Sequence, residues 1–546
     1  MNTEIIAFFS AAGIFRKRTV EKQREAFDAE SEAFKAEFSR DLNDDDWQML
    51  IAYQADKAEA KRKREAEKLA RDAAKAAKLA AMPIAGGDAS PHSHISIYPR
   101  GRYILTCAQN NTLVDDTFWQ SLLVYAEKHN AKILVAKVLY NKKAFRQPGI
   151  EEAEEYWFDD KVKPYLVEGQ IDLAGSHFIA DANVIPTAKW PTSGFDGITP
   201  SGVNAFIPAT KIELRVSAAL KGAETKVISS TGACTMRNYI MRKTGAIAAF
   251  GHNIGALFVD TENNVFRHLE QMQGAAGFYD TDGFYSPSGF SPLSAGNVAA
   301  LQLGDIHAEK MEAENLSRAQ ELILALEPAN LVLHDVLDFS SRNHHNIKDC
   351  VFVYSQTMAG NTVEGDLIKL ANVLDSLASC TIGQVHIVES NHDLAINTWL
   401  KNADFKADPV NALVYLDCMK ALYEHIGRGK SEYFNMLAYA YEYIGGGKYG
   451  HLIQFHETDE SLIIAGTENG NHGHNGANGA RGNPKGFANL GVPINTGHTH
   501  SPSIYGPCYT AGVTASLYMG YNVGASSWAV AHIVTYDNGQ RQILFM

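Results

Sequence analysis

The sequence has no long apolar run, no closely paired cysteines and no excess of basic residues. No stretch of its 546 residues approaches the ~20 consecutive apolar residues of a membrane-spanning helix, so no membrane partner is expected. The six cysteines are scattered without the spacing of a zinc site, which favours a reducing, cytoplasmic setting. The formal net charge of −13 shows no basic surplus of the kind that non-specific nucleic-acid binders usually carry.

Glycine and proline are also absent from residues 17–81, which are rich in Ala, Glu, Lys and Arg and are therefore predicted to be helical. Residues 1–81 carry 16 basic and 16 acidic residues, so the whole charge deficit lies in 82–546. A solvated helix, an oligomerisation arm or a direct DNA contact would each fit this segment. Because such helices have little apolar area, we predict that they pack on another subunit of a homo-oligomer.

A turn-rich linker at 82–91 ends this extension, and three domains are predicted: 1–95, 96–295 and 296–546. In the second domain, strand 103–107, helix 117–129 and strand 133–136 form a βαβ unit of a smaller α/β domain. Residues 246–290 read as hairpins and loops. This domain has neither a phosphate-binding loop nor a dinucleotide fingerprint, although polar loops at 108–112 and 226–232 could line a site.

In the third domain, four apolar runs each end in polar side chains of metal-ligand type. Because open α/β sheets form their sites at the carboxyl ends of strands, these groups are expected to meet at one cation site. A single Asp-x-His pair is weak evidence for a metal site. Four strand ends of this kind, one after another along the chain, are stronger evidence. The four groups are Asp305 and His307; Asp335; Asn391, His392 and Asp393; and His498 and His500.

This order of motifs resembles the calcineurin-type metallophosphoesterase superfamily over about residues 296–546. The resemblance implies an α/β sandwich of two mixed sheets between helical layers. It also implies two divalent cations bridged by one aspartate, at the position of Asp335. The mixed His, Asp and Asn ligands suit manganese, and no thiolate selects zinc.

The same resemblance implies a role for each motif residue. The first metal would take Asp305, His307, Asp335 and His500; the second would take Asp335, Asn391, His498 and a further histidine. The His-Gly pattern favours His472 as that last ligand, with His474 as a neighbour or substitute. His392 corresponds to the catalytic histidine that protonates the leaving oxygen or stabilises the transition state.

Two departures from the superfamily pattern affect the loops around the site. His334 and Ser390 stand where glycines normally precede the second and third motifs, so loop geometry and substrate access are expected to differ. Several nearby polar side chains could bind substrate phosphates or could be ordinary loop polarity. These candidates are Arg342, His344, His474, Arg481 and Lys485.

A narrower resemblance comes from residues 108–112, 334–339 and 472–479, which are similar to early-expressed, host-DNA-degrading proteins of large tailed bacteriophages. It implies a manganese-dependent DNase acting in the cytoplasm of the infected bacterium. Two other functions stay open. One is a phosphatase or phosphodiesterase for nucleotides or other small phosphoesters, which the acidic body favours; the other is a DNA-binding scaffold with a decayed metal site.

Overall fold

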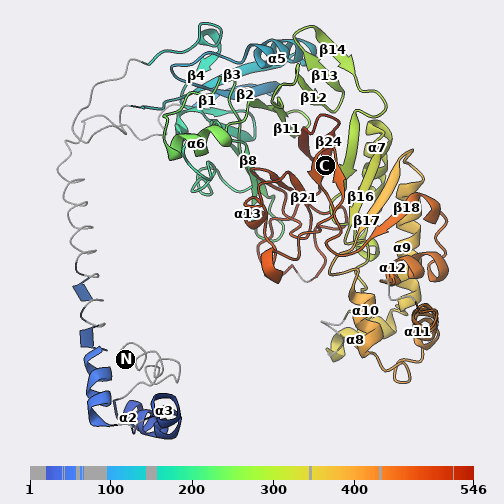
Figure 1. Ribbon diagram of the computed structural model, residues 1–546. Helices are drawn as coiled ribbons and strands as arrows, with labels where there is room; N and C mark the ends of the chain where they lie inside the picture. Colours follow the sequence, from blue (N-terminus) through green and yellow to red (C-terminus); the bar gives the residue numbers. More distant parts are fainter. Residues whose placement is uncertain are drawn as a thin grey trace. The chain divides into compact units, whose positions relative to one another are not determined.

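The computed structural model describes residues 20–66 with gaps, 95–142, 156–343, 347, 349–429, 433–520 and 522–546, and it comprises two compact units, 1–89 and 90–546 (Figure 1). In the first unit, α2 (Val20–Ala29) and α3 (Ser31–Phe38) precede helical residues 44–53. The buried apolar side chains described there are Phe27, Phe34, Trp47 and Leu50. This is a small core for a unit of that length.

The second unit contains a six-stranded sheet in the order β18-β17-β16-β15-β24-β25. Its strands are β15 (Val298–Gln302), β16 (Asn330–His334), β17 (Gln384–Val388), β18 (Ile453–His456), β24 (Ala531–Tyr536) and β25 (Arg541–Phe545). The first four run parallel, and β24 and β25 are antiparallel additions. Since the carboxyl ends of β15, β16 and β17 lie at one edge, the segments that follow them meet there.

Helices cover one face of this sheet, where a large apolar core forms between them and the strands (Figure 1). The amphipathic helix α9 contributes most of its apolar side chains to that core. The helices are α7 (Ala313–Leu326), α9 (Val363–Ala378), α10 (Ala395–Asn402), α11 (Ala412–Gly427) and α12 (Met436–Tyr439). A further helix, α8 (Cys350–Met358), has no buried residue.

The opposite face packs on part of an eleven-stranded mixed sheet, as Ala300, Val332 and Val388 contact Ile464. That sheet has the order β1-β5-β6-β7-β9-β8-β22-β23-β21-β20-β19. Its strands are β1 (Ile95–Ile97), β5 (Gln170–Asp172), β6 (Ser176–Ile179), β7 (Asn204–Ile207), β8 (Glu213–Ser217), β9 (Lys226–Ser230), β19 (Ile463–Ile464), β20 (Thr467–Glu468), β21 (Ile494–Thr496), β22 (Ser503–Tyr505) and β23 (Cys508–Thr510). The ranges 96–295 and 296–546 therefore share one sheet, joined where β8 pairs with β22.

A five-stranded sheet, β11-β10-β2-β3-β4, contains the predicted βαβ unit. Its elements are β2 (Arg102–Gln109), α5 (Asp116–His129), β3 (Lys132–Val138), β4 (Leu166–Val167), β10 (Gly255–Asp260) and β11 (Val265–Glu270). One face packs on α5 and the other joins the core beneath the eleven-stranded sheet. A short sheet of β12 (Phe278–Asp280), β13 (Gly283–Ser286) and β14 (Gly289–Pro292) follows.

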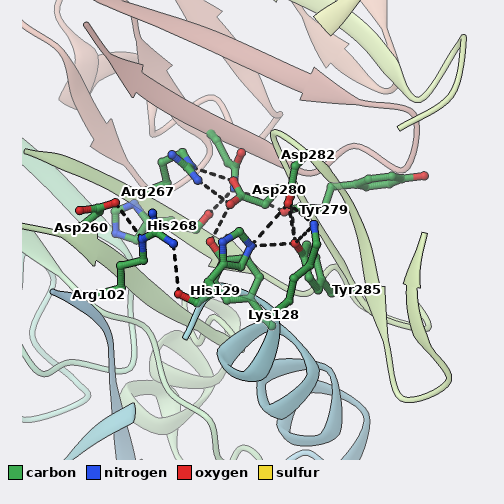
Figure 2. A network of polar contacts seen from close by, with 12 residues as sticks. Arg102, Lys128, His129, Asp260, Arg267, His268, Tyr279, Asp280, Asp282 and Tyr285 are labelled. Carbon is green, nitrogen blue, oxygen red and sulfur yellow. Dashed lines mark hydrogen bonds and ion pairs between the residues drawn. The ribbon is translucent and has the colours of Figure 1, made fainter. Parts of the chain in front are cut away.

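A polar network ties β11, β12 and α5 together (Figure 2). The Arg267 guanidinium donates to both oxygens of buried Asp280, each at 2.7 Å. The Tyr125 hydroxyl donates to the same carboxylate at 2.7 Å. Lys128 lies 2.5 Å from Asp282, so Asp280 and Asp282 each already have a basic side chain as partner.

The protein is thus of the mixed α/β class, as the sequence predicts. Within 246–290, where hairpins are predicted, β10 and β11 form an antiparallel hairpin. Residues 246–250, which are predicted to lie in hairpins and loops, belong instead to helix α6 (Lys243–Phe250). The sequence does not indicate this helix, because its apolar run lacks a clear helical period. No helix in the described part of the chain is long and apolar enough to span a membrane.

Candidate metal centre

The candidate ligands follow the strands at one edge of the six-stranded sheet. Asp305 and His307 come just after β15, Asp335 directly after β16, and Asn391 three residues after β17. A second loop set reaches the same place from the neighbouring sheet: His472 lies beyond β20, and His498 and His500 lie beyond β21. Residues almost two hundred positions apart therefore converge on one site.

The first group is Asp305, His307, Asp335 and His500, all buried, whose ligand atoms lie within 4.8 Å of one another. The Nε2 atoms of His307 and His500 are 3.0 Å apart. His500 Nε2 is 3.1 Å from Asp305 Oδ2, and His307 Nε2 is 3.7 Å from Asp335 Oδ2. Two imidazoles and two carboxylates at this separation make a suitable set for one divalent cation.

The second group is Asp335, His472 and His498, again within 4.8 Å of one another. His472 Nε2 lies 3.3 Å from Asp335 Oδ2. Asp335 thus belongs to both groups, which is the position of a bridging carboxylate. Of the two candidates for the further histidine ligand, His472 belongs to this group and His474 does not; their ring centroids are 5.5 Å apart.

Unpartnered buried atoms test whether a cation fits these groups. Buried polar atoms without a partner cost roughly 1–3 kcal/mol each, so a natural site usually satisfies them. Among the described residues, several ligand-type atoms here are buried without a hydrogen-bond partner: Asp305 Oδ1, both oxygens of Asp335, Asn391 Oδ1, both ring nitrogens of His472, and His500 Nδ1. This donor set fits divalent cations, and the inclusion of Asn391 places its amide oxygen among the available ligands.

The electrostatics agree with that fit. Burial alone would raise the pKa of Asp335, but the neighbouring histidines His472 and His392 outweigh it and hold that pKa well below its usual range. Burial and the charge on His472 lower the pKa of His498 to about 4, which keeps this imidazole neutral. An ionised carboxylate and a neutral imidazole are the forms that bind metal.

His392 lies at the mouth of the centre and has a partner that sequence reasoning missed. Its Nδ1 is 3.3 Å from Asp338 Oδ1, and His307 Nδ1 is 3.4 Å from the same oxygen. Burial opposes protonation of His392, yet the charges on Asp335 and Asp338 raise its pKa to about 9. Asp338 therefore orients a ligand and the candidate acid together. The only sequence signal for it is its spacing of three residues from Asp335.

The backbone around the centre adopts a strained conformation at four candidate ligands. His307, Asp335, His498 and His500 have φ values of 40°, 46°, 69° and 54°, in the left-handed region. Such residues cost of order 1–3 kcal/mol each and cluster at functional sites. Gly497 lets the backbone pass close to the Asp305 carboxylate, because a Cβ there would lie 2.2 Å from Asp305 Oδ1.

Two hollows flank His392 and contain some of the predicted substrate contacts. One, of about 410 Å³, is lined by His392, Asn391 and His474 among others. The other, of about 550 Å³, is lined by His392, His500 and Arg481 together with Trp528, whose ring meets that of His500 edge-on at 4.1 Å. The sequence offered no signal for Trp528, which lies beyond the last histidine motif.

Two of the remaining predicted contacts, Arg342 and Lys485, line neither of these two hollows. Arg342 pairs with Asp408, with Nε–Oδ2 and Nη2–Oδ1 distances of 2.7 and 3.1 Å, so its charge is already matched. His344 lies outside the described residues. Lys485 lies further along the loop from Arg481, beside aromatic rings.

Comparison with known proteins adds one relationship. A scan against protein-family models finds no match. The chain is 43% identical over 460 residues to protein A1 of Escherichia phage T5, an alignment covering 81% of each chain. The chain belongs to the family of phage T5 protein A1. This relationship supports the predicted phage resemblance, while no family match supports the metallophosphoesterase superfamily. The name A1 itself states no activity.

Proposed function

We propose that this A1-family protein is a metal-dependent phosphodiester hydrolase that degrades host DNA in the cytoplasm of an infected bacterium. The observation that carries the proposal is the sharing of Asp335 by two buried ligand groups beside His392. Two divalent cations, which we propose are manganese, would supply charge neutralisation and Lewis acidity to phosphodiester hydrolysis when bound.

The protein's own residues would perform two tasks in this reaction. The first ligand group, Asp305, His307, Asp335 and His500, would hold one cation, and Asp335, Asn391, His472 and His498 the other. His392 would hold a proton near the leaving oxygen of the scissile bond, with Asp338 fixing the orientation of the ring. General acid catalysis of this kind typically contributes ~10²–10⁴-fold to the rate.

DNA is favoured over a small phosphoester because the candidate acid lies between two open hollows. A strand could pass His392 with nucleotides on both sides, whereas a mononucleotide would need only one hollow. The net charge of −13 favours the alternative, a phosphatase or phosphodiesterase acting on small phosphoesters. Both reactions need the same centre, so they differ in substrate size alone.

The test is incubation of the purified full chain with supercoiled plasmid, linear DNA and a small chromogenic phosphodiester. Manganese is present in one series and EDTA in the other. The proposal expects both DNAs to be cut only with manganese, with little sequence preference and strong inhibition by salt. Rapid hydrolysis of the small ester while both DNAs stay intact would favour the alternative instead.

A further inference from the structure

The hollow that contains His392, His500 and Arg481 continues away from the metal centre. Asn483 and Thr499 line both that hollow and a neighbouring one of about 250 Å³, so the two are contiguous. The second hollow is lined by Arg215, Lys485 and Tyr505 among others. A surface path therefore leads from His392 and His500, past Arg481, to the loop that contains Lys485.

This path ends at an aromatic pair with two lysines. The rings of Trp190 and Tyr505 meet edge-on, with centroids 5.2 Å apart. Lys485 Nζ lies 5.4 Å from the Trp190 ring centroid and 5.0 Å from that of Tyr505. A second lysine contacts the same ring: Lys189 Nζ lies 4.9 Å from the Trp190 centroid. We call these four residues the aromatic platform.

The cations along the path are available to a ligand. In the described part of the chain, no carboxylate lies within 4.0 Å of the charged groups of Arg481, Lys189 or Lys485, all exposed residues. Arg215, by contrast, is already paired with Asp196, its Nη2 lying 3.0 Å from Oδ2. Beyond 4.0 Å, the charge on Lys485 partly opposes the rise that burial causes in the pKa of Glu213, so the cluster is only partly neutralised on a chain with a net charge of −13.

Other features agree with a strand of nucleic acid as the occupant. Lys485 follows Arg481 by four positions, so their Cα atoms lie at most ~14 Å apart. A strand carries one phosphate per ~3.4 Å at helical spacing, so this stretch spans at most about four phosphates. Bases stack on aromatic side chains regardless of sequence, and Trp190 is a half-buried aromatic residue at the end of the path.

The hollow on the other side of His392 differs. Among the residues that the structure describes, no lysine or arginine lines it; its members include Asn343, Thr398 and Thr458. Phosphate contacts are therefore concentrated on the side of Arg481 and Lys485.

From this asymmetry we infer that a single nucleic-acid strand leaves the metal centre along Arg481, Asn483 and Thr499 and is held at its far end by the aromatic platform. The inference rests on the proposed nuclease function and specifies how that site would bind its substrate. Lys189, Trp190 and Lys485 are then substrate-binding residues remote from the reacting bond. They increase DNA affinity by contacting phosphates and bases away from the metal centre.

The test is fluorescence anisotropy with a labelled single-stranded oligonucleotide of about 12 nucleotides. It uses the full chain in EDTA, so that binding is measured without cleavage. The double variant Lys189→Glu/Lys485→Glu should weaken binding at least tenfold at low salt. It should also lower the slope of log affinity against log salt by about 1.4, since each phosphate contact contributes ~0.7 on a single strand.

Three further variants separate stacking and general charge from the path itself. Trp190→Ala should weaken binding by roughly fivefold or more with the salt slope unchanged, whereas Trp190→Phe should retain most of the affinity. The matched control is Lys132→Glu, because Lys132 Nζ also lies over a ring, 4.4 Å from the Tyr98 centroid, but lines neither hollow. Melting curves check that each variant is folded.

Binding by the double variant equal to that of Lys132→Glu would overturn the inference. If the wild type also cuts DNA with manganese, only the path is refuted and the proposed function stands. A wild type that binds the oligonucleotide through the platform but cuts no DNA refutes the proposed function and leaves the path supported. A wild type that neither binds nor cuts DNA refutes both.

Discussion

At the scale of single residues, the centre depends on side chains whose positions are fixed by buried carboxylates. His392 is the clearest case, since Asp338 contacts both this histidine and the candidate ligand His307. The same carboxylate thus contacts both a proposed metal ligand and the proposed acid. Removing His392 should separate the two, because His392 belongs to neither of the two ligand groups that share Asp335.

We expect His392→Gln to keep its manganese content while losing ~10²–10⁴-fold in the rate of phosphodiester hydrolysis. The amide can occupy similar space but cannot donate a proton as an acid. Elemental analysis and single-turnover cleavage of DNA provide the two measurements. A variant that loses its metal along with its activity would show that His392 acts as a ligand instead.

A second residue-scale prediction concerns Gly497, where an added Cβ would lie 2.2 Å from Asp305 Oδ1 and 3.4 Å from His472 Nδ1. Gly497→Ala should therefore displace a ligand and lower manganese affinity by about 10–100-fold, as changes next to metal ligands do. Isothermal titration with manganese measures this. Gly427→Ala is the control, because nothing lies within 4 Å of its Cβ position; equal affinities in the two variants would contradict the explanation.

At the scale of elements, β11 contributes a buried histidine to the packing of the two sheets near the C-terminal hairpin (Figure 2). His268 Nε2 donates to the backbone oxygen of Ser230 at 2.8 Å. Burial, only partly opposed by this hydrogen bond, lowers the pKa of His268 to about 4. The imidazole is therefore neutral in the folded protein at physiological pH.

This neutrality predicts a pH-dependent stability. Below the unfolded-state pKa of ~6.5, His268 is protonated in the unfolded chain but stays neutral in the folded chain down to about pH 4. The free energy of unfolding therefore falls by roughly 3 kcal/mol as the pH falls through this window. His268→Gln, which keeps a donor for Ser230, should flatten that dependence. Urea unfolding between pH 7 and pH 4 tests it, and an unchanged slope in the variant would refute the assignment.

The elements also show which parts of the site sequence could predict. The strand ends at β15, β16 and β17 were predictable because an apolar run followed by ligand-type residues is a local pattern. The pairing of Arg342 with Asp408, 66 residues later, depends on packing between loops and leaves no local signal. The same is true of the aromatic platform: Trp190 precedes Thr192, whose backbone N–H donates to Glu213 of β8, and Tyr505 lies on β22, which pairs with β8.

At the scale of the whole molecule, the chain has a small N-terminal unit and a large second unit. The eleven-stranded sheet takes strands from both sides of the predicted boundary at 295, so the range 96–295 contributes directly to the sheet behind the metal centre. This explains why residues such as Trp190 and Arg215 can lie near loops of the candidate site. The larger unit is expected to need both ranges to fold.

The N-terminal unit has few buried apolar side chains among its described residues, and this supports the prediction of a homo-oligomer. Deleting residues 1–89 should therefore give a smaller assembly that retains manganese and hydrolysis of a small phosphodiester. Light scattering of the intact and shortened chains measures the change. A monomeric intact chain would refute the prediction.

The proposed function depends on Asp335 being shared by two cations in one catalytic centre. Its test measures manganese content and DNA cleavage in the same samples. Purified wild type and Asp335→Ala are loaded with manganese, dialysed, and analysed for metal per chain and for plasmid cleavage. The account predicts two manganese ions per wild-type chain, loss of both ions and of cleavage in Asp335→Ala, and a folded variant by melting. Unchanged metal content with full cleavage in Asp335→Ala would contradict it.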